Sequence, residues 1–184
     1  MRHGDSCGEK DRNGVAYKQC HPLSDYTDAA TTLVLRYPSL FARKGAMGKG
    51  AHAVPIVLAT DDPAVAAEAQ ALSGAAMAGG ATFRFVTQQM DRAKYNTGTS
   101  IDQLSAINND ASSMKEIYHD LWAMSTCGAF VGSFTSTIAW NTYELMIARQ
   151  RHFPPFIGVD QFALGDQRTM VNHEHITWNG RAAR

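Results

Sequence analysis

The sequence contains little cysteine. Cys7, Cys20 and Cys127 are the only three among 184 residues, and they are too few and too widely spaced for a disulfide scaffold. None belongs to a Cys-x-x-Cys pair, which argues against a structural zinc site. Cys7 and Cys20 flank a short loop, so they either pair in an oxidising compartment or remain reduced and partly buried as small apolar side chains.

An excess of one charge is also missing. Lys and Arg together number 17, and so do Asp and Glu, so no global field attracts nucleic acid or an anionic membrane. Apolar runs stay far below the roughly 20 residues that cross a bilayer. We therefore expect no nucleic-acid partner and no membrane segment, and any bound anion must be held by a local site.

Two familiar phosphate-binding motifs are absent. The stretch "GAMGKGAH" contains Gly48 and Lys49, but Arg43 stands where a P-loop has its first glycine, and no Ser or Thr follows the lysine. No Gly-x-Gly-x-x-Gly follows a predicted strand. These absences exclude a P-loop and argue against the usual dinucleotide fold.

What the sequence does contain is an alternation of two periodicities. Short apolar runs rich in β-branched or aromatic residues predict strands at 53–59, 82–86, 129–133 and 155–159. Amphipathic patterns predict helices at 24–37, 61–73, 110–125 and 135–150, with Ser24, Asp62 and Asp110 as N-caps and Pro63 in a first turn. The inward-facing side chains predicted for the last two helices are Met114, Ile117, Tyr118, Leu121 and Trp122, and Ile138, Thr142, Leu145 and Met146. Residues 39–52 and 88–109 are predicted to be loops.

The alternation predicts an α/β fold with a parallel sheet and helices on both faces. Ligands of such sheets bind at the carboxyl ends of the strands. Polar clusters follow this rule at 60–62 and 133–137, and a third lies at 2–5. We expect one domain over residues 1–160 and a polar tail over residues 161–184.

The stretch "FVGSFTSTIAWNTYELM" joins a predicted strand to a predicted helix through a run of hydroxyls. Free N–H groups and the positive end of the helix dipole converge at such a start and favour a phosphate. Alternatively, Ser133 or Thr135 only caps the helix.

Four segments together carry a family resemblance: "RHGDSC", "CHPLSDY", "VLATDDPAV" and "HDLWAMSTCGAFVGSFTSTIAWNTYELM". In order and spacing they resemble the α1,6-fucosyltransferase superfamily, which includes core N-glycan and nodulation fucosyltransferases and resembles the protein O-fucosyltransferases. The resemblance covers roughly residues 2–160. It implies a Rossmann-like domain, the C-terminal one of a GT-B-type enzyme, which binds the donor GDP-fucose.

The family's first motif reads His-x-Arg-x-x-Asp, and Arg2 and Asp5 match it while the histidine would precede Met1. We therefore expect the chain to correspond to the donor-binding half of a larger enzyme, whose first strand and N-terminal domain lie outside this sequence. The resemblance implies that Arg2 holds the donor diphosphate, which suits a bidentate guanidinium. The alternative for Arg2 is a disordered terminal residue. Asp5 is expected to orient this loop or to pair with Arg2.

The resemblance also assigns the two ends of the nucleotide. Thr135 and Ser136 correspond to the pair that binds the β-phosphate. Asp120 corresponds to an aspartate that reads guanine, since a carboxylate can accept from both N1–H and N2–H of that base. The alternative for Asp120 is a solvated helix residue.

Asp61 and Asp62 are adjacent, unlike the spaced carboxylates of a metal-binding Asp-x-Asp motif. The family works without a metal, so we expect no metal ion and no cofactor besides the donor, and we assign this pair to ribose or loop contacts.

The family inverts the sugar configuration, which calls for a base near the acceptor hydroxyl. Glu9 lies a few residues after the first motif and is the candidate.

The function implied is transfer of fucose from GDP-fucose to a glycan or glycoprotein acceptor with inversion. The alternative is a nucleotide-sugar-binding module without turnover, because acceptor placement would come from the absent domain. The resemblance also implies a Golgi or ER lumen location for a full-length parent.

Overall fold

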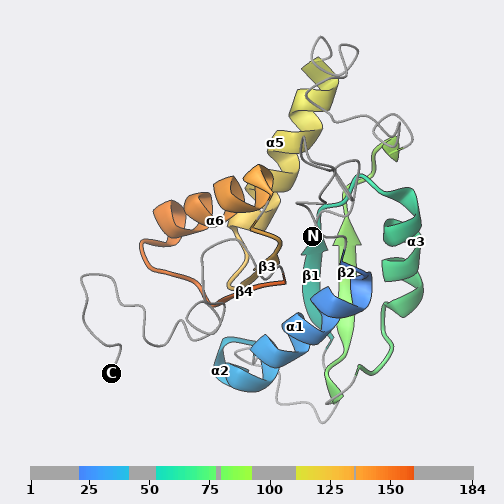
Figure 1. Cartoon of the computed structure of the whole chain (residues 1–184), viewed down its shortest axis with the longest axis vertical. Coiled ribbons are helices and arrows are strands. Elements are labelled where there is room, and N and C mark those ends of the chain that lie inside the picture. Colours follow the sequence, from blue (N-terminus) through green and yellow to red (C-terminus); the bar gives the residue numbers. More distant parts are fainter. Residues whose placement is uncertain (1–20, 42–52, 78–79, 93–110, 135, 160–184) are drawn as a thin grey trace, which may run out of the picture.

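The computed structural model describes residues 21–41, 53–77, 80–92, 111–134 and 136–159 (Figure 1). Helices and strands alternate along these segments. Their order is α1 (Leu23–Arg36), α2 (Pro38–Phe41), β1 (Val54–Leu58), α3 (Pro63–Leu72), β2 (Phe83–Thr87), α5 (Ala111–Ser125), β3 (Phe130–Gly132), α6 (Thr137–Gln150) and β4 (Phe156–Gly158).

Both pairs of strands are parallel. In the first sheet Val54 of β1 lies opposite Phe83 of β2, and in the second Phe130 of β3 lies opposite Phe156 of β4. The predicted α/β class and all four predicted strands are thus confirmed. The expected single sheet is not formed among the described residues, because the strands pair two by two as β1-β2 and β3-β4.

The helices pack as two pairs, one beside each sheet, and each pair also contacts a strand of the other sheet. Helix α1 contacts α3, and it also reaches β3 and β4, while α5 packs against α6 and touches β1. Figure 1 shows α3 beside the β1-β2 pair and α5 with α6 beside the β3-β4 pair. In the part of the chain that the structure describes, no helix is long and apolar enough to cross a membrane.

Each sheet has its own core cluster. The first combines aliphatic and phenylalanine side chains, and the second is largely aromatic, with ring pairs such as Phe134 and Phe156 at 5.4 Å between centroids. Their buried members are Leu23, Leu58, Ala69, Phe83 and Phe85 in the first and Phe130, Phe134, Tyr143, Met146 and Phe156 in the second.

Two predicted local features of the first segment are wrong. Helix α1 begins at Leu23 with Pro22 at the N-cap, so Ser24 lies inside the first turn, since proline already presets the helical entry. Pro38–Phe41 forms the short helix α2, whereas residues from 39 onward were predicted as a loop. The predicted cap Asp110 lies outside the described residues.

The predicted inward faces of α5 and α6 are only partly correct. Four of the predicted side chains are exposed instead: Met114 by 39%, Tyr118 by 61%, Trp122 by 65% and Leu145 by 45%. Leu121, Thr142 and Met146 are buried as expected. On α5 the buried positions are Ser113, Leu121, Met124 and Ser125. The prediction placed Trp122 in the core because its side chain is large and apolar. In the structure Trp122 lies at the surface of α5, and the Arg149 guanidinium stacks over it at 4.1 Å from the ring centroid.

Candidate functional site

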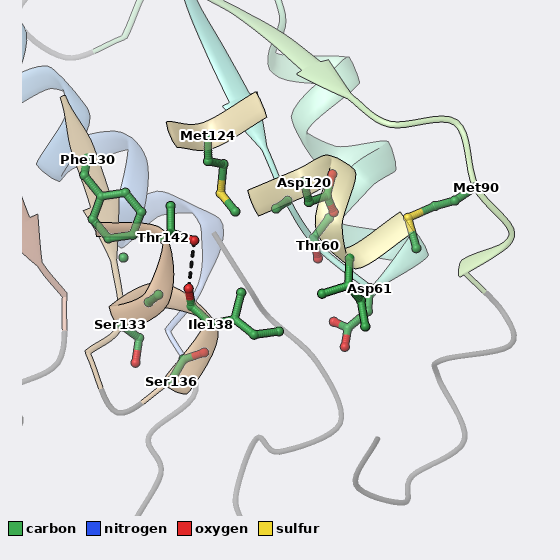
Figure 2. Close-up of a pocket in the computed structure, with 14 residues that line it drawn as sticks. Thr60, Asp61, Met90, Asp120, Met124, Phe130, Ser133, Ser136, Ile138 and Thr142 are labelled. Carbon is green, nitrogen blue, oxygen red and sulfur yellow. Dashed lines mark hydrogen bonds between the residues drawn. The ribbon is translucent and has the colours of Figure 1, made fainter. Parts of the chain in front are cut away.

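A pocket opens at the carboxyl ends of β1 and β3, where the predicted ligand site should lie. In Figure 2, Thr60 and Asp61 lie on one side of the pocket and Ser133 and Ser136 on the other. The lining residues are Ala59, Thr60, Asp61, Met90, Ile117, Asp120, Met124, Phe130, Gly132, Ser133, Ser136, Ile138, Ala139 and Thr142.

Three of the predicted site residues meet at this pocket. Asp61 follows β1, Asp120 lies on α5, and Ser136 stands at the start of α6, yet all three line the same cavity. Asp62, which was assigned together with Asp61, is not among the lining residues. Arg2, Asp5, Glu9 and Thr135 lie outside the described residues, so their predicted roles remain predictions.

The turn from β1 to α3 is closed by its own side chains. Asp62 is the N-cap, and its Oδ1 accepts from the N–H of Ala64 at 2.8 Å, with Pro63 at the first helical position as predicted. The N–H of Asp62 in turn donates to Oγ1 of Thr60 at 3.1 Å. Asp61 lies between these two residues in the same turn. It is buried at the pocket wall, with 9% of its surface exposed.

The turn from β3 to α6 is built differently. Ser136 is the N-cap of α6 with extended backbone, but its side chain makes no capping hydrogen bond. Its own N–H donates to the carbonyl of Ser133 at 3.1 Å. The first-turn N–H groups of α6 therefore have no side-chain cap from Ser136, and they lie at the edge of the pocket.

Gly132 lets this turn approach the strand closely. A Cβ built at Gly132 would stand 2.6 Å from a ring carbon of Phe130 and 3.4 Å from Cβ of Ala139. No real Cβ tolerates the first distance, so any larger residue would displace the Phe130 ring or α6. The glycine thus holds the start of α6 against the end of β3.

Asp120 is half-buried at the pocket rather than solvated. It shares a face of α5 with Ile117 and Met124, three residues before and four after, and all three line the pocket. Burial raises the pKa of the Asp120 carboxyl to about 6, and the nearby Arg92 guanidinium limits the rise. The carboxylate is therefore mostly ionised at neutral pH, and a fall to about pH 6 would protonate half of it.

Two residues around Asp120 were missed in the sequence, where Gln88 to Asn109 was predicted to be a featureless loop. With its amide nitrogen turned toward α5, Gln88 donates to Oδ1 of Asp120 and to the carbonyl of Glu116, both at 3.0 Å. Arg92 donates from Nε to the carbonyl of Thr60 at 3.0 Å and from a terminal nitrogen to that of Gln88 at 2.6 Å. Gln88 follows β2 directly, so the strand-end rule could have found it.

The pocket offers hydroxyls and helix N–H groups on one side and carboxylates on another, over an apolar floor that includes Met124 and Ile138. Its cavity volume is about 70 Å³, below the roughly 300–1,000 Å³ of pockets that bury a whole ligand. Among the described residues no three His, Cys, Asp or Glu side chains gather as a metal site. Chemically, the arrangement suits polar contacts to parts of a larger anionic ligand.

No protein-family profile matches the chain, and no curated protein sequence matches it.

Proposed function

We propose that this pocket is part of the donor site for GDP-fucose in a fucosyltransferase-like protein. The observation that carries the proposal is the convergence of Asp61, Asp120 and Ser136 on one pocket. Asp61 and Ser136 were selected as polar residues at predicted strand ends as well as by the resemblance, while Asp120 was selected by the resemblance alone, and 59 positions separate it from Asp61. The strand-end rule explains why Asp61 and Ser136 lie together, but it gives no reason for Asp120 to share their cavity.

The phosphate end of the proposed donor lies at α6. The Ser136 hydroxyl, which makes no capping hydrogen bond, and the first-turn N–H groups of α6 are the donors that a β-phosphate would engage. The dipole of this 14-residue helix favours the negative charge at the same place. Thr135, the other residue of the resembling pair, would contribute from the same turn.

The base end lies at Asp120. An ionised carboxylate accepts two hydrogen bonds from the N1–H and N2–H edge of guanine, whereas adenine presents no such pair of donors. Gln88 supports the side chain through one carboxylate oxygen. The enclosed volume is small, so the ribose and much of the base would lie outside the walls that the described residues form.

The proposal includes a finer statement of the fold. The alternation of strands and helices and the pairing of α1 with α3 and of α5 with α6 support a Rossmann-like organisation, with helices on both faces of one sheet. It would be the C-terminal domain of a GT-B-type enzyme. Asp61 and Asp62 would shape the loop near the ribose.

Transfer itself would use Arg2 on the diphosphate, positioned by Asp5, and Glu9 as the base for an acceptor hydroxyl, with inversion at the sugar. The acceptor would be a glycan or glycoprotein. No metal ion is needed in this scheme, because Arg2 and the start of α6 would carry the charge of the leaving diphosphate.

Titration calorimetry with GDP and ADP, each with and without EDTA, tests the site. We expect GDP to bind more tightly than ADP, to remain bound in EDTA, and to weaken below pH 6 as Asp120 becomes protonated. Asp120→Asn should weaken GDP toward the affinity of ADP and flatten the pH dependence, while Glu68→Gln, at an exposed position of α3 away from the pocket, should leave both unchanged. Equal affinities for GDP and ADP would reject the guanine assignment, and loss of binding in EDTA would reject the metal-free scheme.

A further inference from the structure

The side-chain amide of Gln88 lies between two acceptors, which fixes the direction in which it bonds. Its nitrogen donates to Oδ1 of Asp120 and to the backbone carbonyl of Glu116, both at 3.0 Å. An amide nitrogen carries two hydrogens, so these two bonds use both. The carbonyl of Glu116 can only accept, so turning the amide over would set oxygen against oxygen. Gln88 therefore presents a donor to Asp120.

The backbone of Gln88 is held as well as its side chain. Gln88 follows β2 directly, and its carbonyl accepts from a terminal nitrogen of Arg92 at 2.6 Å. Nε of the same guanidinium donates to the carbonyl of Thr60 at 3.0 Å. A guanidinium keeps its charge throughout the pH range in which a carboxyl titrates, so this anchor does not change when Asp120 takes up a proton.

A fixed donor makes the two carboxylate oxygens of Asp120 unequal. Oδ1 faces an N–H and must accept, so a proton taken up by the carboxyl goes to Oδ2, since an O–H at Oδ1 would meet the amide hydrogen. In the ionised state both oxygens are acceptors. In the neutral state Oδ1 still accepts, and Oδ2 becomes a donor.

The surroundings of Asp120 bring this protonation close to neutral pH. Burial raises the pKa of its carboxyl to about 6. Among the nearby charged residues Arg92 and His119 lower this pKa, and Glu116 raises it. Asp61, at the end of β1, lines the same pocket. A hydrogen bond to the ionised form also favours that form, so the amide donor acts in the same direction as Arg92.

We propose that Gln88 is a positioning residue for base recognition, which keeps Oδ1 of Asp120 an acceptor, directs the proton to Oδ2 and so makes the choice of base depend on pH. The proposal rests on the proposed guanine contact of Asp120 and identifies the group that controls it. With both oxygens ionised, the carboxylate accepts from N1–H and N2–H of guanine. With Oδ2 protonated, it offers one donor beside one acceptor, which matches N1 and N6–H of adenine and opposes one guanine N–H with a donor.

The first test uses the protein without nucleotide. NMR titration of the Asp120 carboxyl carbon measures its pKa in the wild type, in Gln88→Met and in Gln89→Met. Methionine keeps the length of glutamine but has no N–H, and Gln89 is the exposed neighbour that serves as control. Loss of a hydrogen bond to the ionised form should raise the Asp120 midpoint by about one pH unit in Gln88→Met. Gln89→Met should leave the midpoint unchanged.

The second test is calorimetry with GDP and with ADP at pH 5, 6, 7 and 8. Both nucleotides carry the same diphosphate, so its own titration cancels in the ratio of their dissociation constants. In the wild type the preference for GDP should fall by about tenfold or more from pH 8 to pH 5, with a midpoint that follows the measured Asp120 pKa. In Gln88→Met the same fall should occur about one pH unit higher.

An unchanged Asp120 midpoint in folded Gln88→Met would overturn the inference, and a loss of stability alone would make Gln88 a structural tie to α5. Gln88→Leu, which also lacks the N–H groups, replaces Gln88→Met if urea denaturation shows the latter to be unfolded. A constant preference for GDP across the pH range in which Asp120 titrates would overturn the inference too, while the donor site would stand. Equal affinities for GDP and ADP at pH 8 would instead reject the guanine contact itself, and the titration without nucleotide would still decide whether Gln88 controls the proton.

Discussion

Helices α3 and α6 both begin at a turn that follows a strand, but their first turns are satisfied differently. Asp62 caps α3 with a 2.8 Å bond from the N–H of Ala64, whereas Ser136 stands at the same position of α6 and its side chain makes no capping bond. Both residue types are strong N-caps. The difference fits the proposed function, in which the start of α3 contributes stability and the start of α6 binds the ligand.

The surroundings of the two turns agree with this division. The start of α3 is held by Thr60 and Pro63, which are local in sequence. The start of α6 is held by packing instead. Gly132 allows a close approach between the end of β3 and Ala139 of α6, and the helix packs on the second core cluster. Among the described residues, packing rather than a side-chain cap from Ser136 fixes the position of α6.

The largest effect is expected where packing holds α6. Met146 is fully buried in the second cluster, so Met146→Ala should lower the free energy of unfolding by about 2–5 kcal/mol. Urea denaturation measures it. The adjacent Leu145, 45% exposed, is the control, and Leu145→Ala should change stability by about 0.5 kcal/mol or less. Equal losses would mean that packing does not fix α6 as described.

Ser136→Ala should have the next largest effect, and on binding rather than stability. Loss of a hydrogen bond to a charged phosphate should weaken GDP by about 1.5–3 kcal/mol, while GMP, which has no β-phosphate, should bind both proteins alike. Thr137→Ala, at an exposed hydroxyl one residue further along α6, is the control in calorimetry. A variant that loses GMP as much as GDP would indicate a damaged fold.

Asp62→Ala should show the opposite pattern. Removing the cap of α3 should cost about 1 kcal/mol of unfolding free energy and weaken GDP by less than that, because Asp62 supports the loop but does not line the pocket. Asp62→Asn, which retains a capping oxygen, should recover most of the stability. If Asp62→Ala weakens GDP more than it destabilises the protein, the two helix starts are not divided between stability and binding.

The smallest effect concerns the pH dependence of stability. Burial raises the pKa of Asp120 to about 6, so between about pH 4 and pH 6 the folded state holds a proton that the unfolded chain has released. The free energy of unfolding should therefore fall as pH rises through this window. Asp120→Asn should remove that slope and stabilise the protein at pH 7.5 by up to about 1 kcal/mol, since solvent screens part of the shift. Chemical denaturation at pH 4, 5, 6 and 7.5 measures both.

Much of the fold followed from local patterns. The four strands and helices α3, α5 and α6 were predicted within a few residues, because β-branched runs, Asp62 with Pro63, and helical periodicity are local signals. The separation into two sheets was not predicted, since strand order depends on contacts between distant segments. The outward position of Trp122 was missed for a related reason: only the assembled neighbours show that Arg149 covers its ring.

The candidate site was also predictable where its residues follow a local pattern. Asp61 and Ser136 follow strands, so the strand-end rule brought them together without any structure. Asp120 lies in the last two turns of a helix, and only the family resemblance singled it out. The strand-end rule could have placed Gln88 at this edge of the sheet, but its pairing with Asp120 is a contact across 32 positions that no local pattern predicts.

The two bonds of Arg92 have a mechanical consequence. Its guanidinium joins the carbonyl of Thr60 to that of Gln88, and Gln88 in turn holds Asp120. The exits of β1 and β2 and this part of α5 are therefore linked by one chain of hydrogen bonds. A ligand that shifts the Asp120 carboxylate would disturb Gln88 and Arg92 as well, so a change at the pocket would reach the ends of both strands of the first sheet.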